Sequence, residues 1–156
     1  MFGFLKRKVR AVYAPVDGQI VALESVPDEV FSQKMVGDGV AIIPLSNIFT
    51  APIDGVVSKI FSSNHAYSIK SIKDLEVMVH IGLDTVALAG KGFTRIANEG
   101  DEVKVGDAII EVDLAYIREH AKDIVTPIII TDTSDVKNIE KNLAIVKSQD
   151  KIMEVS

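Results

Sequence analysis

The chain of 156 residues has no cysteine, no tryptophan and only three histidines, and it contains no apolar run long enough to span a bilayer. The absence of cysteine excludes a disulfide framework and any thiolate-ligated metal site. The absence of a long apolar run excludes a membrane-spanning helix. The apolar stretch at the N-terminus is too short for the core of a secretory signal, so we expect no such signal.

Basic residues are few compared with acidic ones, 17 Lys and Arg against 22 Asp and Glu, which gives a net charge of −5. Four of the basic residues lie within Lys6–Arg10. An acidic body repels a phosphate backbone, so we expect no nucleic-acid partner and instead an attraction for basic proteins. We expect residues 1–10 to form a short tail and residues 11–156 to form a single domain.

An internal repeat and many short β-branched runs predict the fold class. Ala14–Gly18 recurs as Ala51–Gly55, and the residues from Val36 to Ile42 resemble those from Val105 to Ile110. Short apolar runs separated by glycine turns are typical of all-β proteins, so we expect an antiparallel β-sandwich or barrel-sandwich hybrid with internal duplication. The expected strands are Gln19–Leu23, Gly39–Ile43, Val56–Phe61, Leu75–Ile81, Asp107–Val112 and Pro127–Thr131, with edge strands at Leu143–Val146 and Ile152–Val155.

One or two short helices are expected beside the strands. The clearest begins after Asp113, which can cap it, and carries an apolar stripe formed by Leu114, Ile117 and Ala121. His120 falls in the last turn of this helix, where we expect a surface residue rather than a ligand.

The other two histidines are the candidate catalytic residues, because the chain has no cysteine to act as a nucleophile near neutral pH. In the run Leu75–Ile81, alternation places His80 and Met78 on the face opposite the core-facing residues. An imidazole nitrogen of His80 can accept a phosphoryl or acyl group. If Val56–Phe61 and Leu75–Ile81 are neighbouring strands, His65 lies close enough to stabilise the developing charge.

The residues alone leave two other interpretations of these histidines open. Both are compatible with surface or interface histidines, since a single histidine on a strand is more often structural than nucleophilic. Both are also compatible with a zinc site completed by Asp84 or a water molecule, although their spacing matches no compact metal motif.

Three longer stretches carry a resemblance to a known family. They are Val26–Phe31 together with Lys34–Val40, Lys59–Ile69, and Val79–Phe93. With them the chain resembles the glucose-type enzyme IIA family of the phosphoenolpyruvate-dependent sugar phosphotransferase system, over about Ala14–Val146. The resemblance implies a cytoplasmic, monomeric phosphotransferase component that needs no cofactor. It would accept a phosphoryl group on a histidine from the phosphocarrier protein HPr and pass it to the IIB domain of a sugar permease, transiently at the inner face of the membrane.

The resemblance also implies roles for single residues. His80 matches the phosphorylated histidine, through Nε2, and His65 the histidine that assists transfer. Gly82 matches the residue whose carbonyl holds Nδ1–H of the phosphorylated histidine, and Ser63 replaces a threonine that hydrogen-bonds the second histidine. Some members bind regulated enzymes or permeases with zinc between the two histidines, so His65 and His80 are the candidate zinc ligands.

The family binds its partners through an apolar surface rimmed by acidic residues. The matching positions are Asp28, Val30, Phe31, Met35, Val36, Phe61, Met78, Asp84 and Val86. An apolar patch provides affinity and excludes water, and the two acids can pair with arginines of a basic partner. Met78 stands where a phenylalanine is common in the family.

Two alternatives come from other classes of protein. A biotinyl or lipoyl carrier domain also has repeated turns in a small β-rich fold, and Lys34-Met35 is the nearest match to its modified lysine. A non-catalytic regulatory module would bind partners through the same apolar surface.

Overall fold

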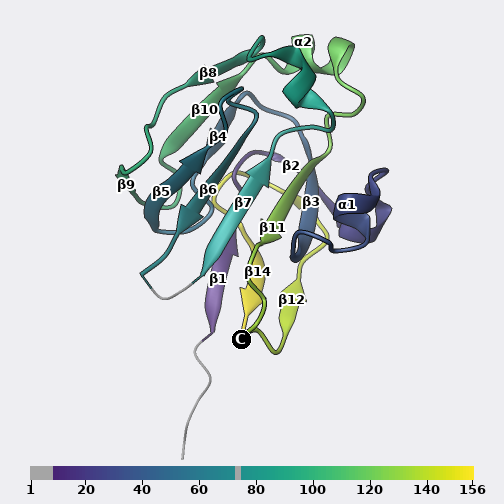
Figure 1. Cartoon of the computed structure of the whole chain (residues 1–156). Coiled ribbons are helices and arrows are strands. Elements are labelled where there is room, and N and C mark those ends of the chain that lie inside the picture. The colour runs from purple at the N-terminus through teal and green to yellow at the C-terminus, as the bar shows by residue number, and fades with distance from the viewer. Residues whose placement is uncertain (1–8, 73–74) are drawn as a thin grey trace, which may run out of the picture.

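The computed structural model describes residues 9–72 and 75–156, so most of the predicted tail lies outside the described residues. Antiparallel strands dominate and helices are short, which confirms the predicted fold class. The chain forms an open sandwich of one large sheet and two small ones (Figure 1). Among the described residues, no helix has the length and apolar character needed to cross a bilayer.

The largest sheet has eight strands in the order β13-β2-β3-β11-β7-β6-β5-β9. Their bounds are β13 (Ile145–Val146), β2 (Gly18–Ala22), β3 (Asp38–Pro44), β11 (Thr126–Ile130), β7 (Glu76–His80), β6 (Ala66–Lys70), β5 (Gly55–Ile60) and β9 (Glu102–Val103). All neighbouring strands in this sheet are antiparallel. The strand β6 separates β5 from β7, so the hypothesis that these two are direct neighbours is wrong.

Two three-stranded sheets complete the sandwich. One has the order β1-β14-β12, and the other has the order β4-β10-β8. Their bounds are β1 (Arg10–Tyr13), β14 (Lys151–Val155), β12 (Ile139–Lys141), β4 (Ile48–Thr50), β10 (Ala108–Val112) and β8 (Phe93–Arg95). Residues 152–155 were expected to form an edge strand, but β14 lies in the centre of its sheet because β1 and β12 pair with its two sides.

The alternation along β7 positions the main core. Leu75, Val77, Val79 and Ile81 all face the core and are at most 3% exposed. They pack with apolar residues from all three sheets into one large cluster. Because side chains alternate along a strand, His80 lies on the opposite face of β7.

A second apolar cluster covers part of that opposite face. Phe31 and Leu23 pack there onto Met78, Ala41 and Ile129. Met78 is therefore only 9% exposed, and the expectation that it faces outward beside His80 is wrong. The covering segments are too short to show a helical period, so no pattern in the sequence indicated that the face would be covered.

These covering segments are the 3-10 helix η1 (Leu23–Ser25) and the helix α1 (Glu29–Ser32). Figure 1 shows α1 beside β3, while α2 (Leu114–His120) lies at the opposite end of the sheet from β12 and β14. The prediction of α2 is confirmed, because the Asp113 carboxylate accepts the Tyr116 N–H and caps the helix. A further 3-10 helix, η2 (Thr85–Leu88), follows the end of β7.

The first repeated segment marks a true internal duplication, because its two copies bond each other reciprocally. Tyr13 N–H donates to the Pro52 carbonyl at 2.9 Å, and Thr50 N–H donates to the Pro15 carbonyl at 2.8 Å. The aspartate of each copy also closes a distant turn. The Asp17 carboxylate accepts Ser148 N–H at 2.7 Å, and the Asp54 carboxylate accepts Val105 N–H at 2.8 Å.

The similarity between Val36–Ile42 and Val105–Ile110 does not correspond to the structural repeat. The turn Lys104–Asp107 has its structural counterpart at Lys147–Asp150, since each is closed by a lysine N–H that donates to the aspartate carboxylate at 2.8 Å. Gly106 and Gln149 occupy the same position with φ of 92° and 78°. A glutamine in place of glycine hides this relation in the sequence. Residues 36–39 form no turn of this kind.

Candidate functional site

Strand pairing brings the two candidate histidines together. His80 ends β7 and pairs with Ala66, the first residue of β6, so that His65 lies just before the paired strand. Ile81 N–H donates to the His65 carbonyl at 2.7 Å and fixes this arrangement. The two imidazole rings meet edge to face with their centroids 5.1 Å apart. The predicted proximity therefore holds, although β6 and not β5 produces it.

Aromatic side chains enclose the histidine pair on both sides. The ring of Phe31 lies 5.0 Å from that of His80, and the ring of Phe61 lies 5.5 Å from that of His65, centroid to centroid. Phe31 comes from α1 and is buried, whereas Phe61 is half-buried at the end of β5. The four rings form a row that shields the imidazoles from water on two sides.

The turn after β7 fixes the chemical state of His80. Its Nδ1 lies 2.8 Å from the carbonyl oxygen of Gly82, so Nδ1 carries the proton and donates it. The other nitrogen, Nε2, is left with a free lone pair. Gly82 has a φ of 73°, and a Cβ there would lie 2.8 Å from Thr85 Cγ2 and 3.0 Å from the Asp123 carbonyl oxygen. Only glycine therefore fits where this carbonyl is presented.

Burial lowers the pKa of His80 below its ordinary value, while the Gly82 hydrogen bond and the charges of Asp28 and Asp84 act in the opposite direction. Asp28 caps α1 by accepting Val30 N–H at 2.9 Å, so the fold of α1 also positions this charge. Asp84 is exposed and adopts a left-handed φ of 58° directly after the turn. The imidazole is thus neutral near pH 7 and has anions in place to stabilise a cationic form.

The second histidine is more deeply buried than the first. His65 is 5% exposed, and burial lowers its pKa to about 4, with a smaller contribution from His80. Its Nδ1 is buried and has no hydrogen-bond partner among the described residues. Within the described residues the Ser63 hydroxyl does not bond this nitrogen, and its expected role beside His65 stays a prediction. The site thus contains an imidazole that is neutral near pH 7 beside the nucleophilic one.

One residue that sequence reasoning missed holds the loop before His65. The guanidinium of Arg95, in β8, donates two hydrogen bonds to the Asn64 side-chain oxygen, at 3.0 and 2.9 Å. Asn64 itself adopts a φ of 58°, which asparagine tolerates better than most residues. Arginine and asparagine 31 residues apart form no recognisable motif, so the sequence carried no signal for this contact.

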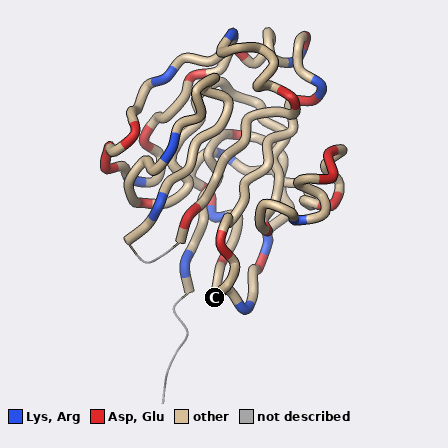
Figure 2. The backbone as a smooth tube through the Cα atoms, in the orientation of Figure 1, with Lys and Arg blue, Asp and Glu red and all other residues tan. Residues whose placement is uncertain are grey.

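The predicted partner surface divides into an exposed and a buried part. Val30, Met35, Val36 and Val86 are exposed, with Met35 at 70%, whereas Phe31 and Met78 are buried beneath them. The first three belong to α1 and the loop after it, and Val86 lies in η2. Figure 2 shows acidic residues along the α1 segment. The exposed aliphatic residues thus lie on the two segments that flank His80, next to Asp28 and Asp84.

The remaining candidates do not join this site. His120 is exposed, stacks on Tyr116 and has its Nδ1 2.9 Å from the Tyr116 carbonyl, as expected for a surface residue. Within residues 9–72 and 75–156, no three His, Asp or Glu side chains cluster as metal ligands would. Lys34 pairs with Glu24 at 3.4 Å and with Asp38 at 3.7 Å, and it lies after α1 rather than in a hairpin. This placement does not favour a biotinyl or lipoyl carrier.

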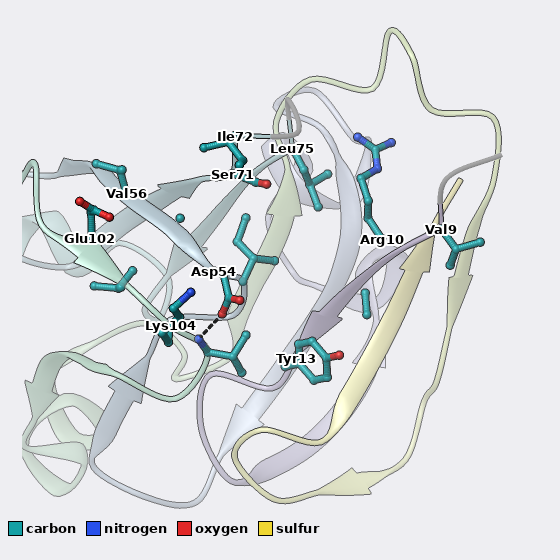
Figure 3. Close-up of a pocket in the computed structure, with 15 residues that line it drawn as sticks. Val9, Arg10, Tyr13, Asp54, Val56, Ser71, Ile72, Leu75, Glu102 and Lys104 are labelled. Carbon is teal, nitrogen blue, oxygen red and sulfur yellow. Dashed lines mark hydrogen bonds between the residues drawn. The ribbon is translucent and has the colours of Figure 1, made fainter.

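One groove of the described structure lies away from the histidines. It has a volume of about 660 Å³ and is lined by residues of β1, β5 and β9 and by the residues between β6 and β7. Figure 3 shows Arg10 and Tyr13 on one side of it and Val56 and Glu102 on the other. Neither histidine lines this groove. The histidine pair lies instead beneath exposed aliphatic residues, an arrangement that suits a protein-sized substrate.

Comparison with known proteins agrees with this site. Residues 10–136 match the family model described as the phosphoenolpyruvate-dependent sugar phosphotransferase system, EIIA 1. The chain is 52% identical over 130 residues to the glucose-specific EIIA component of Haemophilus influenzae, covering 83% of this chain and 78% of that one. It is 45% identical over 137 residues to the corresponding component of Borreliella burgdorferi, covering 88% and 72%.

A solved structure extends the match to the whole fold. The glucose permease IIA from Mycoplasma capricolum superimposes with a TM-score of 0.91 at 39% identity, covering 99% of each chain. Both the sequence of most of the chain and its three-dimensional fold are therefore shared with these proteins. The chain belongs to the EIIA 1 family of the phosphoenolpyruvate-dependent sugar phosphotransferase system.

Proposed function

We propose that residues 11–156 form a phosphocarrier domain that accepts a phosphoryl group from HPr on Nε2 of His80 and passes it to the IIB domain of a glucose-type permease. The observation that carries this proposal is the bond of 2.8 Å between His80 Nδ1 and the Gly82 carbonyl. It places the proton on Nδ1 and leaves the lone pair of Nε2 free. A neutral imidazole with one free nitrogen is the nucleophile that phosphoryl transfer needs.

The chemical step follows from this protonation state. The lone pair of His80 Nε2 attacks the phosphorus atom, the bond between phosphorus and the donor imidazole breaks, and its electron pair returns to the donor. The His80 ring gains positive charge as the new bond forms, while Nδ1 keeps its proton. The Gly82 carbonyl and the charges of Asp28 and Asp84 favour a cationic ring, so they stabilise the product of the attack.

His65 stabilises the phosphoryl group without exchanging a proton. A buried N–H with no acceptor is costly, and Nδ1 has no acceptor within the described part of the chain, so the proton of this imidazole lies on Nε2. From Nε2 the ring donates a hydrogen bond to a phosphoryl oxygen. Because the pKa of His65 is about 4, it remains a neutral donor at physiological pH and does not repel the cationic His80 ring. Ser63 is half-buried in the loop two residues before His65, where its hydroxyl is the proposed neighbour of this imidazole.

The partner surface surrounds the nucleophile. Val30, Met35, Val36 and Val86 would be covered by HPr or by the IIB domain, together with the edges of Phe31, Phe61 and Met78. Covering them excludes water from a labile phosphoryl group. Asp28 and Asp84 lie at the rim of this surface, where they can pair with cationic side chains of a basic partner.

Two finer assignments also belong to this proposal. The phosphocarrier works in the cytoplasm and meets its permease at the inner face of the membrane. Zinc is not needed for transfer; the two imidazoles supply two of the four ligands of a tetrahedral zinc ion, and the described residues supply no complete set. A regulated partner or water would have to contribute the remaining ligands, and a zinc ion on Nε2 of His80 would block transfer through that nitrogen.

The experiment is phosphorylation of the chain by phosphoenolpyruvate, enzyme I and HPr, with the three histidines changed in turn. We expect His80→Gln to abolish incorporation and His65→Gln to slow transfer by about 10²-fold, the cost of losing one donor to a developing charge. His120→Gln, on the exposed helix α2, is the matched control and should transfer at the wild-type rate. Incorporation into the His80→Gln protein would refute the assignment.

A further inference from the structure

The turn that presents the Gly82 carbonyl to His80 is held by hydrogen bonds from several elements. On its first side, Ile81 N–H donates to the His65 carbonyl, and the buried Thr85 hydroxyl donates to the Ile81 carbonyl, both at 2.7 Å. These two bonds join the turn to the neighbouring strand and to η2. They do not fix the next peptide unit, whose carbonyl is the one that contacts His80.

That next peptide unit is held by the segment that leads into β11. Leu83 N–H, in the same peptide as the Gly82 carbonyl, donates to the Asp123 carbonyl at 2.9 Å. The Asp123 side chain accepts Val125 N–H at 2.9 Å, which closes a local turn and aims the Asp123 carbonyl at Leu83. A continuous chain of bonds therefore runs from the Asp123 carbonyl through one peptide to Nδ1 of His80.

Thr126 holds the other side of the same glycine. Its hydroxyl donates to the Ile124 carbonyl at 3.0 Å, and its oxygen accepts Gly82 N–H at 3.4 Å. Thr126 is fully buried, and a buried hydroxyl is retained at a cost unless it is bonded. The transfer chemistry described above uses neither Thr126 nor Asp123. Thr126 nevertheless bonds the Gly82 N–H, and Asp123 bonds the Leu83 N–H in the same peptide as the Gly82 carbonyl, which sets the tautomer of His80.

We propose that Asp123 and Thr126 are positioning residues that hold the two peptide units on either side of Gly82, and through the Gly82 carbonyl keep the proton of His80 on Nδ1. The proposal rests on the proposed function for its consequence, because only a free Nε2 can accept the phosphoryl group. Without these two contacts the peptide can rotate, the carbonyl leaves Nδ1, and the proton distributes over both nitrogens. Part of the protein would then present no lone pair at Nε2.

The test combines two readouts in four variants. Thr126→Val removes the hydroxyl oxygen that accepts Gly82 N–H, and Asp123→Ala removes the carboxylate that closes the turn with Val125 N–H and aims the Asp123 carbonyl at Leu83. Thr126→Ser and Asp123→Asn retain a side-chain oxygen at each position. ¹⁵N NMR of the histidine rings measures the tautomer of His80, and single-turnover transfer from phosphorylated HPr measures the rate. Thr50→Val is the matched control, because Thr50 is also a buried threonine whose hydroxyl donates to a carbonyl, that of Pro15, in another sheet.

We expect Thr126→Val and Asp123→Ala to shift the His80 resonances towards a mixture of tautomers and to slow transfer about tenfold. Thr126→Ser and Asp123→Asn should restore the wild-type spectrum, and Thr50→Val should never lose it. An unchanged His80 tautomer in Thr126→Val and Asp123→Ala would overturn the proposal, whatever the transfer rates. If phosphorylated HPr fails to phosphorylate the wild-type protein, the proposed function fails. The positioning inference still stands in that case if Thr126→Val and Asp123→Ala shift the His80 tautomer. Because Asp123 is half-buried and Thr126 is fully buried, we expect the Asp123 variants to fold even if a substitution at Thr126 does not.

Discussion

At the scale of single residues, the two histidines differ because their surroundings differ. Burial lowers the pKa of both, but only His80 has a carbonyl acceptor and two nearby carboxylates that favour its cation. His65 has the imidazole of His80 as a neighbour and a buried Nδ1 that no described residue hydrogen-bonds. One ring is therefore suited to become charged when it accepts a phosphoryl group, and the other is suited to remain neutral beside it.

The low pKa of His65 predicts how the stability of the protein depends on pH. The unfolded chain binds a proton at this residue near pH 6.5, whereas the folded protein binds it only near pH 4. The stability that buried, neutral His65 contributes is complete above pH 6.5. It is lost as the pH falls towards 4, by up to about 1.4 kcal/mol for each pH unit. The lowered pKa of His80 acts in the same direction.

Urea unfolding at several pH values checks this expectation. The wild-type protein should lose more stability between pH 6.5 and pH 4 than His65→Gln, which has no proton to bind at that position. Equal losses in the two proteins would show that His65 is not buried in its neutral form.

At the scale of elements, the sequence predicted those that carry a clear period or cap. The alternation of Leu75–Ile81 assigned the core face of β7, and Asp113 marked the start of α2. The helix α1 has four residues and shows no period, so neither it nor the cover over Met78 was visible. The place of β6 between β5 and β7 depends on pairing between strands, which no local pattern of residues encodes.

The turn after β7 yields a prediction about backbone geometry. Gly82→Ala should destabilise the protein by about 1–3 kcal/mol, because it combines a positive φ with a Cβ pressed against Thr85 and the Asp123 carbonyl. Gly100→Ala is the matched control, since Gly100 has a φ of 92° but a Cβ there would meet no described atom within 4 Å. It should cost about 1 kcal/mol or less.

Unfolding free energies from urea titration measure both changes. The difference between the two variants isolates the crowding at Gly82 from the cost of a positive φ. If Gly82→Ala is no less stable than Gly100→Ala, the turn is not held as tightly as the hydrogen bonds around it indicate.

At the scale of the whole molecule, duplication explains the framework and only part of the site. The reciprocal bonds of Tyr13 with Pro52 and of Thr50 with Pro15 join two related halves. The repeat of Ala14–Gly18 revealed this relation, but Gln149 in the place of Gly106 hid the second half of it. The two histidines were candidates because the chain offers few other nucleophiles, whereas their specific roles and the remaining site residues came from the family resemblance.

The acidic body of the protein predicts how it meets HPr. Asp84→Asn should slow association with HPr several-fold at low salt and reduce its dependence on ionic strength, because a charge at the rim steers a basic partner. Asparagine tolerates the left-handed φ of 58° at this position, so the change removes charge without straining the turn.

Stopped-flow association at several salt concentrations provides the measurement. Glu111→Gln, an exposed charge on β10 in another sheet, is the control with the same change in net charge. If both variants slow association equally, the effect comes from net charge and the rim has no special position.

The central claim is that His80 accepts the phosphoryl group on Nε2, and ¹⁵N NMR of the phosphorylated protein tests it most directly. After reaction with phosphoenolpyruvate, enzyme I and HPr, the coupling between nitrogen and phosphorus identifies the bonded atom. We predict coupling at Nε2 of His80, with the Nδ1 proton still present. Coupling at Nδ1 of His80, coupling at His65, or no phosphorylation by active donors would contradict it.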